Sequence, residues 1–69
     1  MAYTEDELAE ERHLKNEMMR IGKWYSKNWK NMTREELHKL DDTIRIIDRR
    51  RRELAVISVQ RELEKQNEG

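Results

Sequence analysis

Four consecutive arginines, Arg49 to Arg52, are the residues of this sequence whose type most directly suggests chemistry. Guanidinium groups bind carboxylates and phosphates, so the run could form an anion site. On a helix, however, successive residues rotate by about 100°, and the four side chains would spread over about 300° of its circumference. If the helix is continuous, the four arginines cannot grip one ligand together.

Most of this positive charge has an acidic partner one helical turn away. The pairs at a spacing of four residues are Asp41 with Arg45, Asp48 with Arg52, and Arg49 with Glu53. Opposite charges at this spacing meet on the surface of a helix. The arginine run is therefore predicted to be mainly a solvated, charged face.

Arg51 is the exception, because it falls between Ile47 and Leu54 on the apolar side of the expected helix. A buried guanidinium needs a carboxylate or an anionic ligand. We predict that Arg51 sets the register of the helices by reaching a glutamate on another helix. A role for Arg51 in binding an anion is the alternative.

A second group of cations is interleaved with aromatic residues. From Met18 to Arg34 the chain has no acidic residue, and the cations and aromatics that we single out here are Arg20, Lys23, Trp24, Lys27, Trp29, Lys30 and Arg34. Such mixtures are typical of surfaces that bind nucleic acid or acidic proteins. We predict a partner-binding surface. The alternative is that the cations complement a helix dipole and the aromatics close the end of a hairpin.

Two glutamates each precede a histidine by three residues, Glu10 before His13 and Glu35 before His38. This is the spacing of di-iron carboxylate bundles. In a hairpin of two helices, a rise of 1.5 Å per residue puts the two histidines at levels about 16 Å apart. Cysteine is absent, so there is no thiolate ligand either. We predict no metal site and no cofactor.

Helices must position these residues, and the sequence marks two helix starts. The spacing of a capping box occurs twice, in Thr4 with Glu7 and in Thr33 with Glu36. Proline is absent, and the only glycines are Gly22 and Gly69. We predict one all-α domain over residues 1–69, a two-helix antiparallel hairpin of coiled-coil type. Helix one should span about 5–27, a turn 28–33 and helix two about 34–65, with an asparagine adopting the left-handed conformation in the turn.

Apolar residues recur by threes and fours in both helices, as in a helical seam. They are Leu14, Met18, Ile21 and Tyr25 in helix one, and Leu37, Leu40, Ile44, Ile47 and Leu54 in helix two. Helix two is longer, so its end should overhang helix one and leave apolar residues uncovered, namely Val56, Ile57, Val59 and Leu63. A domain this small also has little core. We therefore predict that these four residues bind a partner and that the hairpin dimerises into a four-helix bundle.

Residues 33–56, TREELHKLDDTIRIIDRRRRELAV, resemble the first helix of the all-helical chorismate mutases. The resemblance covers about a third of the chain and rests on Arg34, Glu35, Leu40, Asp41 and the run from Arg51 to Val56. It implies an anion site at Arg34 and Arg51, although the family's downstream lysine corresponds here to Glu62. The shorter stretch Leu40-Asp41-x-x-Ile44 also resembles the signature helix of short sporulation aspartyl-phosphate phosphatases. Neither set of catalytic residues is complete.

The net charge of the chain and its acidic N-terminus limit the classes of function that we expect. Fifteen basic and fifteen acidic residues cancel, which disfavours a general polyanion binder. The acidic N-terminus predicts no signal peptide, and no apolar run approaches the ~20 residues of a membrane span. We predict a cytoplasmic, non-enzymatic regulatory or adaptor protein that acts by helix-mediated protein–protein binding and self-association, without a membrane partner. A nucleic-acid-binding module that uses residues 20–34 is the second hypothesis, and a chorismate-mutase-like anion site is the third.

Overall fold

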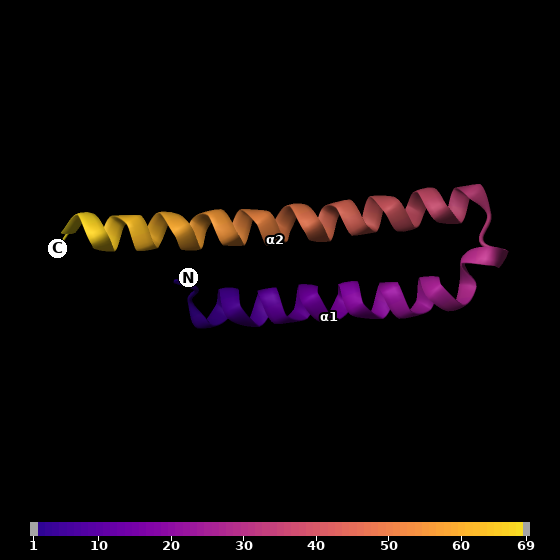
Figure 1. Cartoon of the computed structure of the whole chain (residues 1–69), viewed down its shortest axis with the longest axis horizontal. Coiled ribbons are helices and arrows are strands. Elements are labelled where there is room, and N and C mark those ends of the chain that lie inside the picture. Colours follow the sequence, from indigo (N-terminus) through magenta and orange to yellow (C-terminus); the bar gives the residue numbers. More distant parts are fainter. Residues whose placement is uncertain (1, 69) are drawn as a thin grey trace.

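A computed structural model of the chain describes residues 2–68, which form two antiparallel helices joined by a short turn (Figure 1). Helix α1 spans Glu5–Asn28, the 3-10 turn η1 spans Trp29–Asn31, and helix α2 spans Arg34–Glu68. The molecule is a rod with extents of 56 × 17 × 15 Å. The predicted all-α helical hairpin is confirmed. Over the described range, neither helix contains a stretch long and apolar enough to cross a membrane.

Each helix begins at a capping box, as the sequence predicts. The Glu7 amide donates to Thr4 Oγ1 at 3.2 Å, and the Thr4 amide donates to Glu7 Oε1 at 3.0 Å. At the second start, the Glu36 amide donates to Thr33 Oγ1 at 3.2 Å, and the Thr33 amide donates to Glu36 Oε1 at 3.3 Å. These bonds satisfy amide groups that the first turn of a helix leaves without a backbone partner. The caps therefore fix where both helices start.

The turn between the helices is made without a left-handed residue. The Trp29 amide still donates to the Tyr25 carbonyl, and the Met32 amide donates to the Trp29 carbonyl at 3.3 Å. Met32 is extended, with φ −78° and ψ 136°. No non-glycine residue in the described chain has a positive φ, so the expected left-handed asparagine is wrong. A tightened 3-10 turn followed by an extended residue reverses the chain instead.

The two helices meet along a seam that is apolar near the turn and charged near the open end. On α2 the seam positions alternate by fours and threes and are Leu40, Ile44, Ile47, Arg51, Leu54, Ser58 and Arg61; on α1 they are Glu7, Glu11, Leu14, Met18, Ile21 and Tyr25. Among the described residues only Ile47 and Leu54 are buried apolar side chains, and Ser58 is buried with them. The core is therefore very small.

The seam is incompletely filled near the turn. A groove of about 290 Å3 lies there, lined by Met18, Ile21, Gly22, Tyr25, Leu37, Leu40, Asp41 and Ile44. A Cβ atom added to Gly22 would meet nothing within 4 Å. Glycine inside a helix costs about 1 kcal/mol relative to alanine, and no packing within the chain requires it here.

Helix α2 has 35 residues and α1 has 24, and the C-terminal part of α2 runs past the N-terminal end of α1 (Figure 1). The Arg61 side chain holds this part of α2 to the beginning of the chain, because its Nη1 donates to the Ala2 carbonyl at 3.2 Å. Helix α2 ends at Glu68 rather than near Lys65. Leu63, 54% exposed, lies in this extension, whereas Val56 and Val59 precede Arg61 in the chain, so the overhang alone does not explain the exposure of all the apolar residues expected to lack cover.

Candidate interaction surfaces

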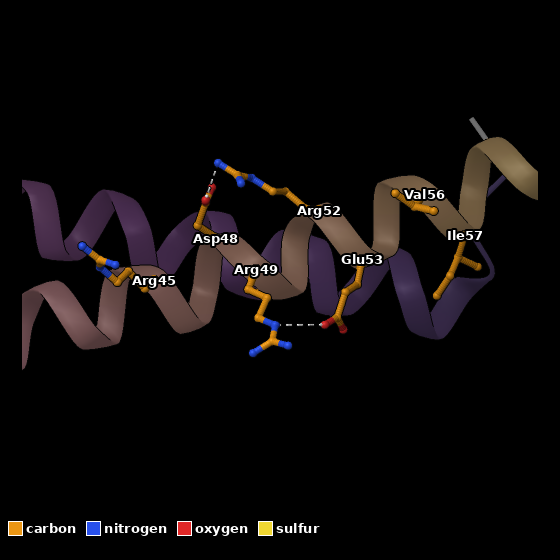
Figure 2. A pocket seen from close by; sticks show the side chains of 7 residues that line it. All are labelled: Arg45, Asp48, Arg49, Arg52, Glu53, Val56 and Ile57. Carbon is orange, nitrogen blue, oxygen red and sulfur yellow. Dashed lines mark ion pairs between the residues drawn. The ribbon is translucent and has the colours of Figure 1, made fainter.

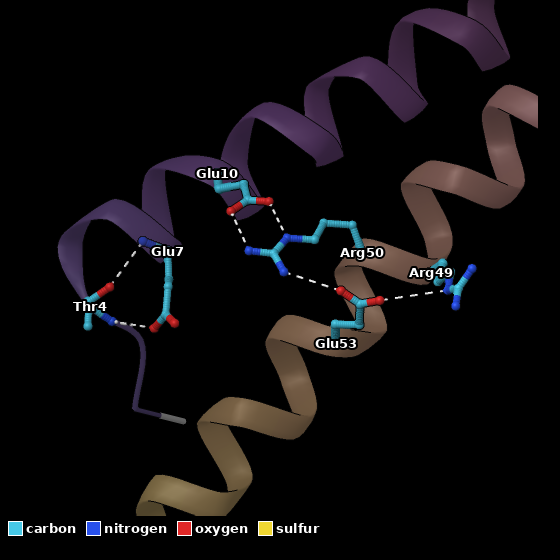
Figure 3. Close-up of polar contacts among 6 residues, drawn as sticks. All are labelled: Thr4, Glu7, Glu10, Arg49, Arg50 and Glu53. Carbon is cyan, nitrogen blue, oxygen red and sulfur yellow. Dashed lines mark hydrogen bonds and ion pairs between the residues drawn. The ribbon is translucent and has the colours of Figure 1, made fainter.

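Three glutamates of α1 pair with three arginines of α2 at the open end of the hairpin, and we call these pairs the interhelical clasp. They are Glu7 with Arg61, Glu10 with Arg50, and Glu11 with Arg51. Arg50 uses Nε and Nη2 on the two oxygens of Glu10, with Nη2 donating to Oε1 at 3.0 Å (Figure 3). Arg61 grips Glu7 in the same two-pronged way, and its Nη2 donates to Oε2 at 3.0 Å. Two parallel hydrogen bonds between a guanidinium and a carboxylate fix the relative orientation of the two side chains as well as pairing their charges.

The clasp includes the predicted contact of Arg51. Its Nε donates to Oε1 of Glu11 at 3.0 Å, so Arg51 does reach a glutamate on another helix. The other oxygen of Glu11 and the Ser58 hydroxyl are buried without a hydrogen-bond partner among the described residues. Burying polar atoms in this state costs stability. These two unsatisfied atoms therefore offset part of the stabilisation that the ion pairs of the clasp provide.

The clasp also changes the acidity of its members. The hydrogen bond from Arg61 is the main cause that lowers the pKa of Glu7 to about 2, and the Thr4 amide adds to it. The hydrogen bond from Arg50 likewise lowers the pKa of Glu10. In return, Glu10 raises the pKa of Arg50, and Glu7 raises that of Arg61. These carboxylates stay ionised near neutral pH, so they are not suited to act as general acids there.

The four consecutive arginines divide between two sides of α2. Arg50 and Arg51 turn toward α1, while Arg49 and Arg52 pair along their own helix, as predicted (Figure 2). The distances are 3.7 Å for Arg49 Nε to Glu53 Oε1, 2.9 Å for Arg52 Nη2 to Asp48 Oδ2, and 2.8 Å for Arg45 Nε to Asp41 Oδ2. Every arginine of the run has a carboxylate partner. The side chains of Arg49 and Arg52 nevertheless remain mostly exposed, at 84% and 79%.

A second row of residues follows the side of α2 away from the seam, and we call it the outer row. Its members alternate by fours and threes and are Arg45, Arg49, Arg52, Val56, Val59 and Leu63. Figure 2 looks onto this side of α2 with α1 behind it, and shows Val56 beyond the arginines in an open pocket. Val56, Val59 and Leu63 are 55%, 50% and 54% exposed. Of the four apolar residues predicted to lack cover, only Ile57 is half-buried.

The cations expected between residues 20 and 34 do not lie along one helix, because η1 interrupts the helical spacing. Arg20 pairs with Glu17, with Nη1 to Oε1 at 3.4 Å, and Arg34 opens α2 on the far side of the turn. The remaining residues, Lys23, Trp24, Lys27, Trp29 and Lys30, gather at the turn end of α1, and we call them the basic tip. Trp24 is 46% exposed and Trp29 is 50% exposed. The tryptophans therefore do not close the hairpin as core residues.

The arrangements expected from resemblance and from metal chemistry are not assembled by the helices. Arg34 and Arg51 lie 17 residues apart on one helix, about 25 Å at 1.5 Å per residue, and Arg51 is already paired with Glu11. Glu10, which belongs to the first glutamate–histidine pair, forms an ion pair with Arg50. Comparison of the chain with models of protein families, with characterised proteins and with solved structures finds no match.

The sequence reasoning missed Arg50, Arg61 and Ser58. A signal was present, because Glu7 and Glu11 continue the spacing of the apolar seam backward from Leu14 in steps of three and four. Ser58 and Arg61 continue the seam of α2 forward in the same way. Apart from Arg51, the seam expected from the sequence contains apolar residues alone, so it lacks the charged positions at the open end.

Proposed function

We propose that this protein is a non-enzymatic regulatory or adaptor protein that acts by binding other helices, and that the first partner of its outer row is a second copy of the chain. The observation that carries the proposal is the exposure of Val56, Val59 and Leu63 at the spacing of a coiled-coil seam. Three aliphatic residues in such a row on a surface helix favour a helical partner.

The outer row favours an antiparallel copy. In a parallel pair, Arg45, Arg49 and Arg52 would face the same arginines of the partner, and like charges would repel. In an antiparallel pair centred near Val59, Val56 of each copy faces Leu63 of the other. Arg52 then lies near the uncharged Asn67 of the other copy, and Arg45 and Arg49 lie farther from the contact.

The size of this contact predicts a weak, reversible dimer. Completing the burial of a half-exposed Val or Leu gains about 1 kcal/mol, half the usual value for a whole side chain, and six such residues give about 6 kcal/mol. Association itself costs about 4–15 kcal/mol in lost freedom. We therefore expect a dimer that forms at high concentration and dissociates on dilution. Such a dimer overlaps at the ends of α2 and forms a longer assembly than a compact four-helix bundle.

A side-by-side four-helix bundle, the arrangement expected from the sequence, would instead use the groove at Gly22. The two arrangements can be separated by variants in sedimentation equilibrium. The double variant Val56→Gln with Leu63→Gln should abolish the dimer and keep the helix content. The matched control Ile46→Gln changes an exposed apolar residue outside the outer row and should leave the dimer intact. Gly22→Glu should also leave it intact.

Two results would overturn this assignment. At the lower cost of association the net gain is about 2 kcal/mol, a Kd of tens of millimolar, so a chain whose average mass does not rise at all by about 5 mM has no interface of the expected strength. A dimer that survives the double change but is lost in Gly22→Glu associates through the groove. Truncation after Glu53 is a poorer test, because it removes the buried Leu54 and Ser58 and the partner of Glu7.

A further inference from the structure

The basic tip is a cluster of cations without acidic partners. Lys23, Lys27 and Lys30 make no ion pair within the described residues, whereas the arginines of α2 from Arg45 to Arg61 all do. No Asp or Glu occurs from Met18 to Arg34. The positive charge of the tip is therefore not compensated locally, although the whole chain is neutral.

The lysines and tryptophans of the tip follow one another closely over the last turn of α1 and η1. Lys23 and Lys27 are four residues apart and Trp24 and Lys27 three, so they are neighbours on the surface of α1. Lys30 Nζ lies over the Trp29 ring, 5.6 Å from its centre. The backbone beneath is held in place, since Asn28 Nδ2 donates to the Trp24 carbonyl at 2.8 Å and the Trp29 amide donates to the Tyr25 carbonyl.

We propose that the basic tip binds single-stranded nucleic acid, with the lysines on phosphates and the tryptophan rings stacked on bases. Proteins that bind single strands without sequence preference combine these two kinds of contact. Lysines bind phosphate as point charges. The two tryptophans, 46% and 50% exposed, favour a nucleic acid as the partner because bases stack on such rings. The inference does not rest on the self-association proposed above.

The number of lysines sets the expected dependence on salt. Three phosphate contacts on a single strand give a slope of log K against log salt of about −2. Binding should then weaken about 20-fold when salt rises from 50 to 200 mM. Both tryptophans of the chain belong to the tip, so intrinsic tryptophan fluorescence reports this site alone.

The experiment is a fluorescence titration of the full chain with oligothymidylate of about 15 nucleotides, a length within the range that small single-strand sites cover. One variant combines Lys23→Gln, Lys27→Gln and Lys30→Gln. Its control, with the same loss of charge, combines Arg12→Gln, Lys15→Gln and Lys65→Gln, three cations elsewhere that make no ion pair within the described residues. Circular dichroism checks that both variants keep their helices.

We expect quenching in the natural chain, at least a tenfold loss of affinity in the tip variant and a change within about twofold in the control. Trp24→Leu should weaken binding even at high salt, because stacking is less sensitive to ions than phosphate contact. The proposal is overturned by absence of quenching at low salt, by equal losses in the two triple variants, or by unchanged affinity in Trp24→Leu. Polyglutamate that binds as tightly with the same quenching would assign the tip to acidic proteins instead.

Discussion

Leu54 is the side chain whose truncation tests the hairpin most directly. It is fully buried and lies on the seam between Arg51 and Arg61, two members of the clasp. Leu→Ala in a protein core costs about 2–5 kcal/mol, depending on how far the surroundings collapse into the space. A seam between only two helices can close partly, so we expect about 2–3 kcal/mol. This is about half the total stability of a small domain and corresponds to a fall in Tm of about 10–20 °C.

Thermal and urea unfolding followed by circular dichroism, at a concentration low enough to keep the chain monomeric, would measure this cost. Val56→Ala is the matched control, because Val56 lies two residues further on and is 55% exposed. Its cost should stay within about 0.5 kcal/mol. Equal costs for the two changes would show that α1 does not cover Leu54. At high concentration Val56→Ala should become destabilising if the outer row forms a dimer.

Three further predictions concern the caps, the groove and the clasp. Thr33→Ala removes the acceptor of the second capping box and should lower the unfolding free energy by about 1 kcal/mol; an unchanged value in urea unfolding would mean that the cap contributes nothing. Gly22→Ala should raise the unfolding free energy by up to about 1 kcal/mol, because the added Cβ meets open space and alanine favours the helix. A loss in the same urea assay would contradict the open space beside Gly22. The pKa of Glu7 is depressed from 4.5 to about 2 in the folded chain, so its contribution is present above pH 4.5 and is lost as pH falls toward 2. Acid titration should show this decline, Glu7→Gln should reduce it, and an identical acid profile in the variant would contradict the role given to the pair with Arg61.

The parts of this fold that could be predicted from the sequence are those that depend on neighbours along the chain. The capping boxes at Thr4 and Thr33 involve residues three apart, and the ion pairs along α2 involve residues four apart. Neither depends on how the helices are placed relative to one another. The contact of Arg51 with a glutamate of the other helix could also be predicted, because a guanidinium between two apolar seam positions has few ways to be satisfied.

Which glutamate pairs with Arg51 could not be predicted, because the choice depends on the rotation and axial offset of the two helices. Several glutamates near the start of α1 were available to Arg51, and only the assembled seam selects Glu11. The same holds for Arg50 and Glu10, which are 40 residues apart in the chain. Glu7 had already been assigned to the cap, and its second contact with Arg61 is invisible to any local pattern.

The division of the seam into an apolar half and a charged half has a consequence for the order of folding. Ile21 and Leu40 face one groove near the turn and are 19 residues apart, whereas Glu7 and Arg61 are separated by 54. Closing the longer loop directly costs about 1 kcal/mol more in chain entropy. Apolar contacts should therefore form first near the turn, where the loop to be closed is shortest. The helices should then pair progressively from the turn toward the termini. Changes at Ile44 should then slow folding, while changes at Glu10 should mainly speed unfolding, a contrast that stopped-flow kinetics would detect.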